Sequence, residues 1–433
     1  MRQGEAAEAA FDSIRAHLAP PLGLMQRIAG QSSVECRASG ATVTLSDGRT
    51  ALDLGSYAVT LLGHGHPEVV AAVTRQLASQ ATATRTLANP VTARFAHELA
   101  AAVDPERLPR VWLGLNGSDA VEAALKLARA RTGRSRVLAV RGAYHGKSMG
   151  ALAATWSERY RAPVAGLLPE VVHLDPGDPG AVAEACARHE PAALIFEPVQ
   201  GENGVVPLAS DILRRWADDA HAAGAFVLAD EVQTGFRCGA VSLALAARIP
   251  VDAVILGKAL GGGVMPLSAV VCTDDLYGPL RRDPFLHTTT FGGHPLSCAA
   301  GIAFLDVLRE SADRAARLEA AVRGGLTDLA ARHPGVLIRV RGRGLLWGLV
   351  FDRPETAGSV LLTACQEGLV LSPCLGRPEV LRLLPPLILS TGETADALGI
   401  LDGACARADT APAASRPDAG RISTTTSPQE LFP

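Results

Sequence analysis

The middle of the chain, from about residue 110 to residue 310, alternates short apolar segments with amphipathic ones. The apolar segments lack a polar–apolar alternation, which is typical of strands buried on both faces, and the segments between them have helical periodicity. This order predicts an α/β fold, in which helices cover a mostly parallel sheet and ligands bind at the carboxyl ends of the strands. The predicted strands are Arg110–Leu115, Arg136–Val140, Glu170–Leu174, Ala192–Phe196, Ala225–Ala229, Ala253–Leu256 and Leu267–Cys272, and the predicted helices are Ser118–Arg131, Pro179–Arg188, Ser210–Ala223 and Leu296–Arg309.

The flanking regions differ from this middle part. We assign residues 1–66 to an N-terminal arm and part of a small domain, with a helical arm broken at Pro20-Pro21 and a hairpin turn at Ser46-Asp47-Gly48. Residues 67–310 are the predicted large domain, and residues 311–405 a smaller α+β domain. Residues 406–433 are rich in Pro, Ser and Thr, and we expect them to form a disordered tail.

Composition excludes several classes of protein. With 433 residues, 48% of them hydrophobic, the chain can bury a large core. A net charge of −3 gives no strong attraction to nucleic acid or anionic lipid, and no apolar run reaches the ~18 residues of a membrane span. The N-terminus lacks the apolar segment of a signal peptide, and the eight scattered cysteines include no C-x-x-C pair. We therefore expect free thiols and a cytoplasmic location.

Lys258 is one of only three lysines, and it follows a predicted strand. Its neighbours are apolar (Val254 to Leu256, Ala259 and Leu260), so burial is expected. A buried lysine has a lowered pKa, which makes its amine a nucleophile able to form a Schiff base. The alternative is a strand-end lysine that reaches solvent.

Asp230 ends the apolar segment AFVLAD. A carboxylate at a buried strand end needs a cationic partner, and the protonated ring nitrogen of pyridoxal phosphate is such a partner. The alternatives are a structural Asp that caps the next turn and a metal ligand acting with Glu231.

Two turns after strands suggest contacts to a flat, phosphorylated group. In Asn116-Gly117-Ser118-Asp119, Gly117 allows a tight turn and Ser118 can cap the helix, whose free N–H groups would bind phosphate. An ordinary N-cap is the alternative; the pattern is neither a Walker loop nor a G-x-G-x-x-G fingerprint. In the second turn, Gly142 to Gly146, Tyr144 can either stack on a cofactor or pack under a loop.

Together with two further stretches these motifs resemble the class III (ω-amine) aminotransferases, which are pyridoxal-phosphate enzymes of fold type I. The resemblance covers about residues 35–400, with the motifs in the family's order. It is carried by Glu197 to Glu202 (EPVQGE), Ala229 to Gly235 (ADEVQTG), Leu256 to Gly262 (LGKALGG) and His287 to Gly293 (HTTTFGG).

The resemblance implies a role for each matching residue at the cofactor. It also implies a homodimer, because one of these residues would come from the partner subunit. Lys258 would hold the cofactor through a Schiff base and then act as a base, and Asp230 would pair with the pyridine nitrogen. Tyr144 and Val232 would stack on the two ring faces, and Gln233 would form a hydrogen bond with the ring hydroxyl. Gly117 and Ser118 would bind the phosphate, and Thr290 of the second subunit would complete the phosphate site.

For the substrates, the resemblance matches Arg382 to the arginine that binds a carboxylate and Glu202 to the glutamate that neutralises it when an amine is bound. Tyr57 would line the pocket. Within the family, three stretches are most similar to the putrescine (diamine) aminotransferases: His145 to Leu152, Gly261 to Pro266, and the triple threonine before Phe291. This similarity implies transfer from a primary ω-amine, a diamine or an amino acid, to a 2-keto acid such as 2-oxoglutarate or pyruvate. The alternatives are an aminomutase or racemase on the same fold, and an aminotransferase acting on an aldehyde or ketone of secondary metabolism.

The sequence departs from the family pattern near the substrate residues. Asn203 stands where Gly usually follows the glutamate, and the stretch Phe236 to Gly239 is one residue shorter than usual. Both departures concern substrate choice and not the reaction. His64-Gly65-His66 matches a structural turn of the family, so we expect no metal site.

Overall fold

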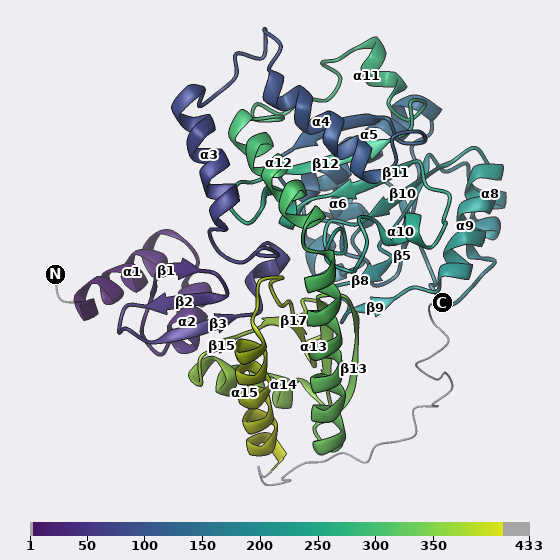
Figure 1. Cartoon of the computed structure of the whole chain (residues 1–433). Helices are drawn as coiled ribbons and strands as arrows, with labels where there is room; N and C mark the ends of the chain where they lie inside the picture. Colours follow the sequence, from purple (N-terminus) through teal and green to yellow (C-terminus); the bar gives the residue numbers. More distant parts are fainter. Residues whose placement is uncertain (1–2, 410–433) are drawn as a thin grey trace.

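The computed structural model describes residues 3–409 (Figure 1). Within these residues, seven strands form a central sheet that is parallel apart from one member, which runs antiparallel to both of its neighbours. All seven match the predicted strands to within one residue at each end. In spatial order they are β4 (Arg110–Gly114), β12 (Ser268–Cys272), β11 (Ala253–Leu256), β10 (Phe226–Asp230), β7 (Ala193–Phe196), β5 (Val137–Val140) and β6 (Val171–Leu174).

Both faces of the central sheet are covered, which explains why its strands are apolar throughout. Along β5, Val137 and Ala139 pack with one hydrophobic cluster, and Leu138 and Val140 pack with another. The first cluster includes helices α5 (Gly117–Thr132) and α6 (Met149–Ala154). The second includes helices α3 (Pro67–Ser79), α4 (Pro90–Val103), α8 (Ala181–Arg188), α9 (Ser210–Ala222) and α12 (Pro295–Arg309).

Short elements connect these layers. Most of them lie in the loops that follow the central strands. They are α7 (Glu158–Arg161), η2 (Ala162–Leu167), the hairpin β8 (Val199–Gln200) and β9 (Val206–Pro207), α10 (Leu243–Ala246), η3 (Lys258–Gly261) and α11 (Gly278–Arg282).

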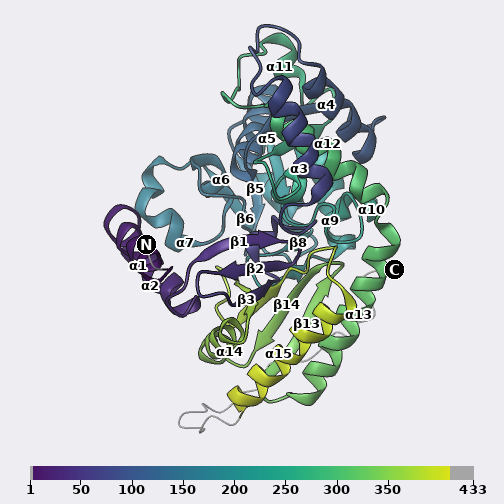
Figure 2. The ribbon, with the colours of Figure 1, turned by 60° about the vertical axis from the view of Figure 1, so that its left-hand side comes forward.

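Helix α13 (Ala312–Arg332) leads from α12 to a second unit (Figure 1). Its antiparallel sheet is covered by α13 and α14 (Pro354–Gln366), and α15 (Thr391–Asp409) packs against both of these helices. Figure 2 shows α14 and α15 beside this sheet. In the described residues its strand order is β13 (Leu337–Arg343), β14 (Leu346–Phe351), β17 (Val380–Leu383) and β16 (Ser372–Pro373).

The N-terminal residues join this second unit through a third sheet. Helices α1 (Gln3–His17) and α2 (Pro20–Ala29) are separated at the two prolines, as predicted. Strands β1 (Glu35–Ser39), β2 (Thr42–Leu45) and β3 (Thr50–Asp53) follow, and β3 pairs in parallel with β15 (Leu369–Val370). The turn η1 (Ser56–Ala58) then leads back toward the central sheet and packs against η3.

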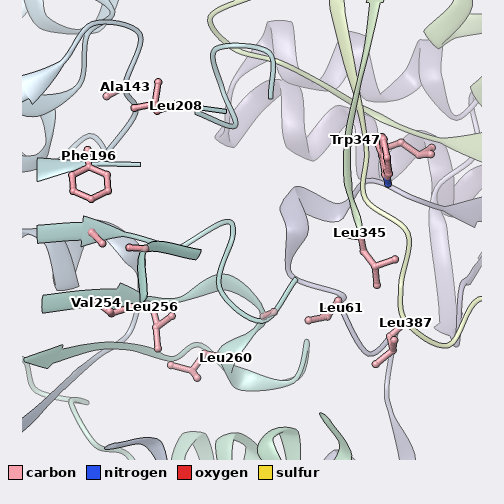
Figure 3. Packing of buried hydrophobic residues seen from close by; sticks show 14 of the residues in the cluster. Leu61, Ala143, Phe196, Leu208, Val254, Leu256, Leu260, Leu345, Trp347 and Leu387 are labelled. Atoms are coloured by element: carbon pink, nitrogen blue, oxygen red, sulfur yellow. The ribbon is translucent and has the colours of Figure 1, made fainter. Parts of the chain in front are cut away.

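One hydrophobic cluster runs from the central sheet into the second unit. It joins Leu256, at the end of β11, and Leu260, in η3, to Leu61, Leu345 and Leu387 (Figure 3). The two units therefore share buried contacts at the carboxyl ends of the central strands.

The predicted tail begins too early. Residues 406–409 form the last turn of α15, in which Ala408 packs against the hydrophobic core. Residues 410–433 lie outside the described residues. In the part of the chain that is described, no helix is both long and apolar enough to cross a membrane.

Candidate active site

Lys258 opens η3, two residues after β11 ends. Its backbone φ is 44°, a left-handed conformation that residues other than glycine rarely adopt and that is often found at functional sites. Burial lowers the pKa of the Lys258 amine, and the nearby Arg382 guanidinium lowers it further, whereas Glu202 and Asp230 oppose this effect. The amine is thus more readily available as a nucleophile than that of a surface lysine.

Asp230 ends β10, beside β11, and its side chain is buried. Its Oδ2 lies 2.7 Å from Nδ1 of His145, and its Oδ1 accepts a hydrogen bond from the Val232 N–H at 3.1 Å. Burial disfavours protonation of His145, but the hydrogen bond and the charge of Asp230 outweigh it, so the pKa of His145 is raised. Asp230 thus carries a charge-assisted contact on one side, and His145 fixes its orientation.

Glu197 follows β7, on the other side of β10. Its Oε1 accepts a hydrogen bond from the Tyr144 N–H at 2.8 Å and so positions the loop after β5. Burial raises the pKa of Glu197 to about 7, with His145 opposing this rise and Asp230 adding to it. Tyr144 itself is half-buried, and burial raises the pKa of its hydroxyl.

The turn after β4 opens helix α5. The helix is capped by Asn116, whose side chain accepts from the Asp119 N–H at 3.0 Å, and not by Ser118 as predicted. Ser118 Oγ instead accepts from the Lys147 N–H at 3.4 Å. A Cβ on Gly117 would lie 2.8 Å from Cγ1 of Val232, so only glycine allows this close approach. The N-terminus of α5 and the residues after β10 therefore face one another.

Several buried polar atoms at this place have no hydrogen-bond partner among the described residues. They include Nε2 of His145, Nε2 of Gln233 and Nε of Arg382. Unsatisfied buried donors are costly, and their clustering at one site indicates a polar ligand. A ring hydroxyl beside Gln233, a ring nitrogen beside Asp230 and a phosphate at the start of α5 would fit these residues.

Glu202 and Arg382 form a buried ion pair between the Glu202 Oε1 and the Arg382 guanidinium. Glu202 Oε2 also accepts the Leu375 N–H at 2.9 Å, and Arg382 donates to the Pro373 carbonyl at 3.2 Å. Both residues affect the pKa of Lys258, so the pair lies close to the lysine amine.

Two predicted residues have exposed side chains in the single chain. Tyr57 lies in η1 and is 72% exposed, with a φ of 52°. Thr290 lies in an exposed loop, where its carbonyl accepts from Arg85 at 3.2 Å. Their roles at the pocket and across a subunit interface remain predictions.

The structure does not support the alternative that Asp230 and Glu231 bind a metal ion together. Glu231 accepts hydrogen bonds from the backbone of Leu243 and Ala244 at the start of α10, and from the hydroxyls of Thr234 and Ser242. Residues 3–409 contain no group of three or more His, Cys, Asp and Glu side chains arranged to hold a metal.

The sequence reasoning missed three residues of this region. His145 and Glu197 stand in quoted motifs, but their partners are far away in the sequence. Arg237 is buried and donates to the carbonyls of Ala58, Leu345 and Pro385, so it links η1 to the second unit. The signal for Arg237 was its position within the shortened stretch Phe236 to Gly239.

Comparisons with known proteins show the family of this chain. A family model described as "Aminotransferase class-III" matches residues 29–405. The putrescine aminotransferase of Pectobacterium atrosepticum is 37% identical over 382 residues, which cover 84% of this chain and 81% of that protein.

Two solved structures have the same arrangement of elements. The ornithine aminotransferase of Toxoplasma gondii superposes with a TM-score of 0.84 at 29% identity, over 93% of this chain and 96% of that one. An amine transaminase from an uncultivated Pseudomonas species, solved with pyridoxal phosphate bound, superposes with a TM-score of 0.77 at 29% identity, over 87% and 95% of the two chains. The fold is thus that of the type I pyridoxal-phosphate enzymes, and this chain belongs to the class-III aminotransferase family.

Proposed function

We propose that this protein transfers the amino group of a primary ω-amine to a 2-keto acid such as 2-oxoglutarate or pyruvate, with pyridoxal phosphate as its cofactor. The observation that carries the proposal is that Lys258 lies near two buried ion pairs, Asp230 with His145 and Glu202 with Arg382, whose carboxylates and guanidinium affect the pKa of its amine. The first pair suits a cationic ring, and the second suits a substrate carboxylate.

The cofactor supplies an electron sink for the bond that breaks at the substrate's amine carbon. The residues proposed to hold it lie in residues 67–310, which we propose as the cofactor-binding domain. Lys258 would bind it covalently, Asp230 would face its ring nitrogen, Gln233 would donate to its ring hydroxyl, Tyr144 and Val232 would enclose its ring, and Gly117 and Ser118 would bind its phosphate.

Residues of the protein itself transfer the proton and bind the two substrates. The Lys258 amine removes and returns the proton at the reacting carbon, because its lowered pKa leaves it neutral more often than a surface lysine. Glu202 neutralises Arg382 while an amine without a carboxylate near its reacting group is bound. When the keto acid enters, Glu202 moves away and Arg382 binds the acid's carboxylate.

The finer assignments are a diamine donor, a homodimer and a cytoplasmic location. The diamine is supported by the resemblance to the Pectobacterium putrescine aminotransferase. The homodimer is supported by exposed apolar side chains such as Phe285 and Phe291 in the loop that carries Thr290. In this proposal, Thr290 of the second subunit reaches the phosphate, and Tyr57 lines the amine pocket.

A donor and acceptor screen tests the proposal. The purified holoenzyme is mixed with diamines, ornithine and monoamines, each with 2-oxoglutarate or pyruvate, and the amino-acid product is quantified. We expect glutamate or alanine to form from at least one amine, and only when a keto acid is present. Conversion of an amino acid to an isomer without any keto acid would instead establish the aminomutase or racemase alternative.

A further inference from the structure

Asn203 directly follows Glu202 in the turn between β8 and β9. Its Nδ2 donates to Oε1 of Gln200 at 2.8 Å, and its Oδ1 accepts from Nε of Arg377 at 3.2 Å. The asparagine amide thus links its own turn to the loop between β16 and β17.

The main chain is held on both sides of Asn203, on one side by the backbone of the other loop and on the other by the side chain of Arg341, which lies on β13. The Gly376 N–H donates to the Glu202 carbonyl at 2.9 Å, and Nε of Arg341 donates to the Gly204 carbonyl at 2.6 Å. A Cβ on Gly376 would lie 2.9 Å from the Glu202 carbonyl oxygen, so the loops are in close contact. The main chain at Glu202 has little freedom to move.

The Glu202 carboxylate is held by the same loop and by β17, which follows it. One oxygen pairs with Arg382 and the other accepts the Leu375 N–H. To release Arg382, Glu202 must break its contacts with both Arg382 and the Leu375 N–H. A rigid main chain at Glu202 also leaves the glutamate side chain fewer alternative positions. Every contact that fixes residues 200–204 therefore favours the closed pair.

We propose that Asn203 is a specificity-determining residue, which ties the Glu202 turn to Gln200 and Arg377 and so biases the protein toward the state in which Glu202 neutralises Arg382. This closed state favours amine donors without a carboxylate near the reacting amine and weakens the binding of dicarboxylates. The inference rests on the proposed function of the Glu202–Arg382 pair. Asn203 does not touch the reacting groups, and it acts through Glu202.

The test is the affinity of the holoenzyme for glutarate, a dicarboxylate without a keto group that cannot react. Asn203→Gly removes both side-chain hydrogen bonds and loosens the main chain, so we expect glutarate to bind about fivefold more tightly, as measured by calorimetry. In single-turnover experiments, kcat/KM for 2-oxoglutarate should rise by a similar factor, and that for the amine should not rise.

Arg377→Ala removes the hydrogen bond from Arg377 to Asn203 and leaves the one to Gln200 in place. We therefore expect glutarate to bind more tightly than to the wild type, but by a smaller factor than in Asn203→Gly. Because Arg377 is exposed, this variant is expected to fold. Arg323→Ala, at an exposed ion pair on α13, is the control and should leave glutarate affinity unchanged. Unchanged affinity in both Asn203→Gly and Arg377→Ala, or an equal gain in Arg323→Ala, would overturn the inference. The wild-type screen for transamination is independent, so failure of the proposed function would be recognised separately.

Discussion

At the scale of single residues, the three lysines have different surroundings. Lys126 and Lys147 are exposed, and the Lys147 ammonium lies 4.3 Å from the centre of the Tyr160 ring. Lys258 is partly buried, and burial lowers its pKa. We predict that borohydride reduction of the holoenzyme, followed by peptide mapping, will place the cofactor adduct on Lys258. An adduct on Lys126 or Lys147 would refute the assignment.

His145 makes stability depend on pH. Its pKa in the folded protein is raised, so its protonation stabilises the fold fully below the unfolded pKa of about 6.5, and this contribution is lost as pH rises through the folded pKa. We expect the destabilisation caused by His145→Gln, measured by urea unfolding of the apoprotein, to be largest in acid and to shrink as pH rises.

His173 provides a control with the opposite sign. Burial lowers the pKa of His173 to about 4, so the wild-type fold is penalised when pH falls below the unfolded value. The destabilisation caused by His173→Gln should therefore shrink in acid. A pH-independent deficit for His145→Gln would show that packing, and not protonation, gives His145 its role.

Arg382 should matter for one half of the reaction only. A keto acid needs the guanidinium, whereas the amine is bound while Glu202 covers it. We expect Arg382→Ala to lower kcat/KM for the keto acid on the order of a hundredfold, which corresponds to about 3 kcal/mol. Single-turnover absorbance traces separate the two halves. Equal damage to both would leave Arg382 a structural residue, and selective damage to the amine half would indicate an amino-acid donor bound through its carboxylate.

At the scale of elements, the central strands were predictable because each is apolar on both faces. Helix α4 was not among the predicted helices, and β15 and β16 have two residues each, too few for a pattern. Contacts such as His145 with Asp230, or Glu202 with Arg382, depend on which strands become neighbours. The sequence motifs predicted a role for most of these residues, but they did not predict the contact between His145 and Asp230.

The hydrogen bonds of Arg237 hold η1 against the second unit, and substitution of this residue tests their contribution to stability. Its three carbonyl partners come from η1, the residue before β14 and the segment after β17. Arg237→Ala leaves a cavity and three carbonyls without this donor, so we expect the free energy of unfolding to fall by about 3 kcal/mol. Arg323→Ala, the exposed comparison, should change it by less than about 0.5 kcal/mol. Similar urea midpoints for the two variants would contradict this role for Arg237.

At the scale of the whole molecule, the proposal that Thr290 of one subunit completes the cofactor site of the other predicts a specific activity for mixed dimers. Lys258→Ala and Thr290→Glu should each be inactive alone, the second because its carboxylate would repel the cofactor phosphate. A mixed dimer contains one site with both changes and one with neither. Refolding the two variants together should therefore restore about a quarter of wild-type activity. No recovery, with dimers present by sedimentation, would place Thr290 outside the partner's site.

The pairing of β3 with β15 has a consequence for synthesis on the ribosome. About 300 residues separate these strands in the chain, whereas all strands of the central sheet lie between them. At ~5–20 residues per second, β3 waits on the order of 15 to 60 seconds for its partner. The central sheet can therefore form first, and the N-terminal strands must keep an open edge until the chain is nearly finished. During that interval, a chaperone that shields strand edges would find its substrate at residues 50–53.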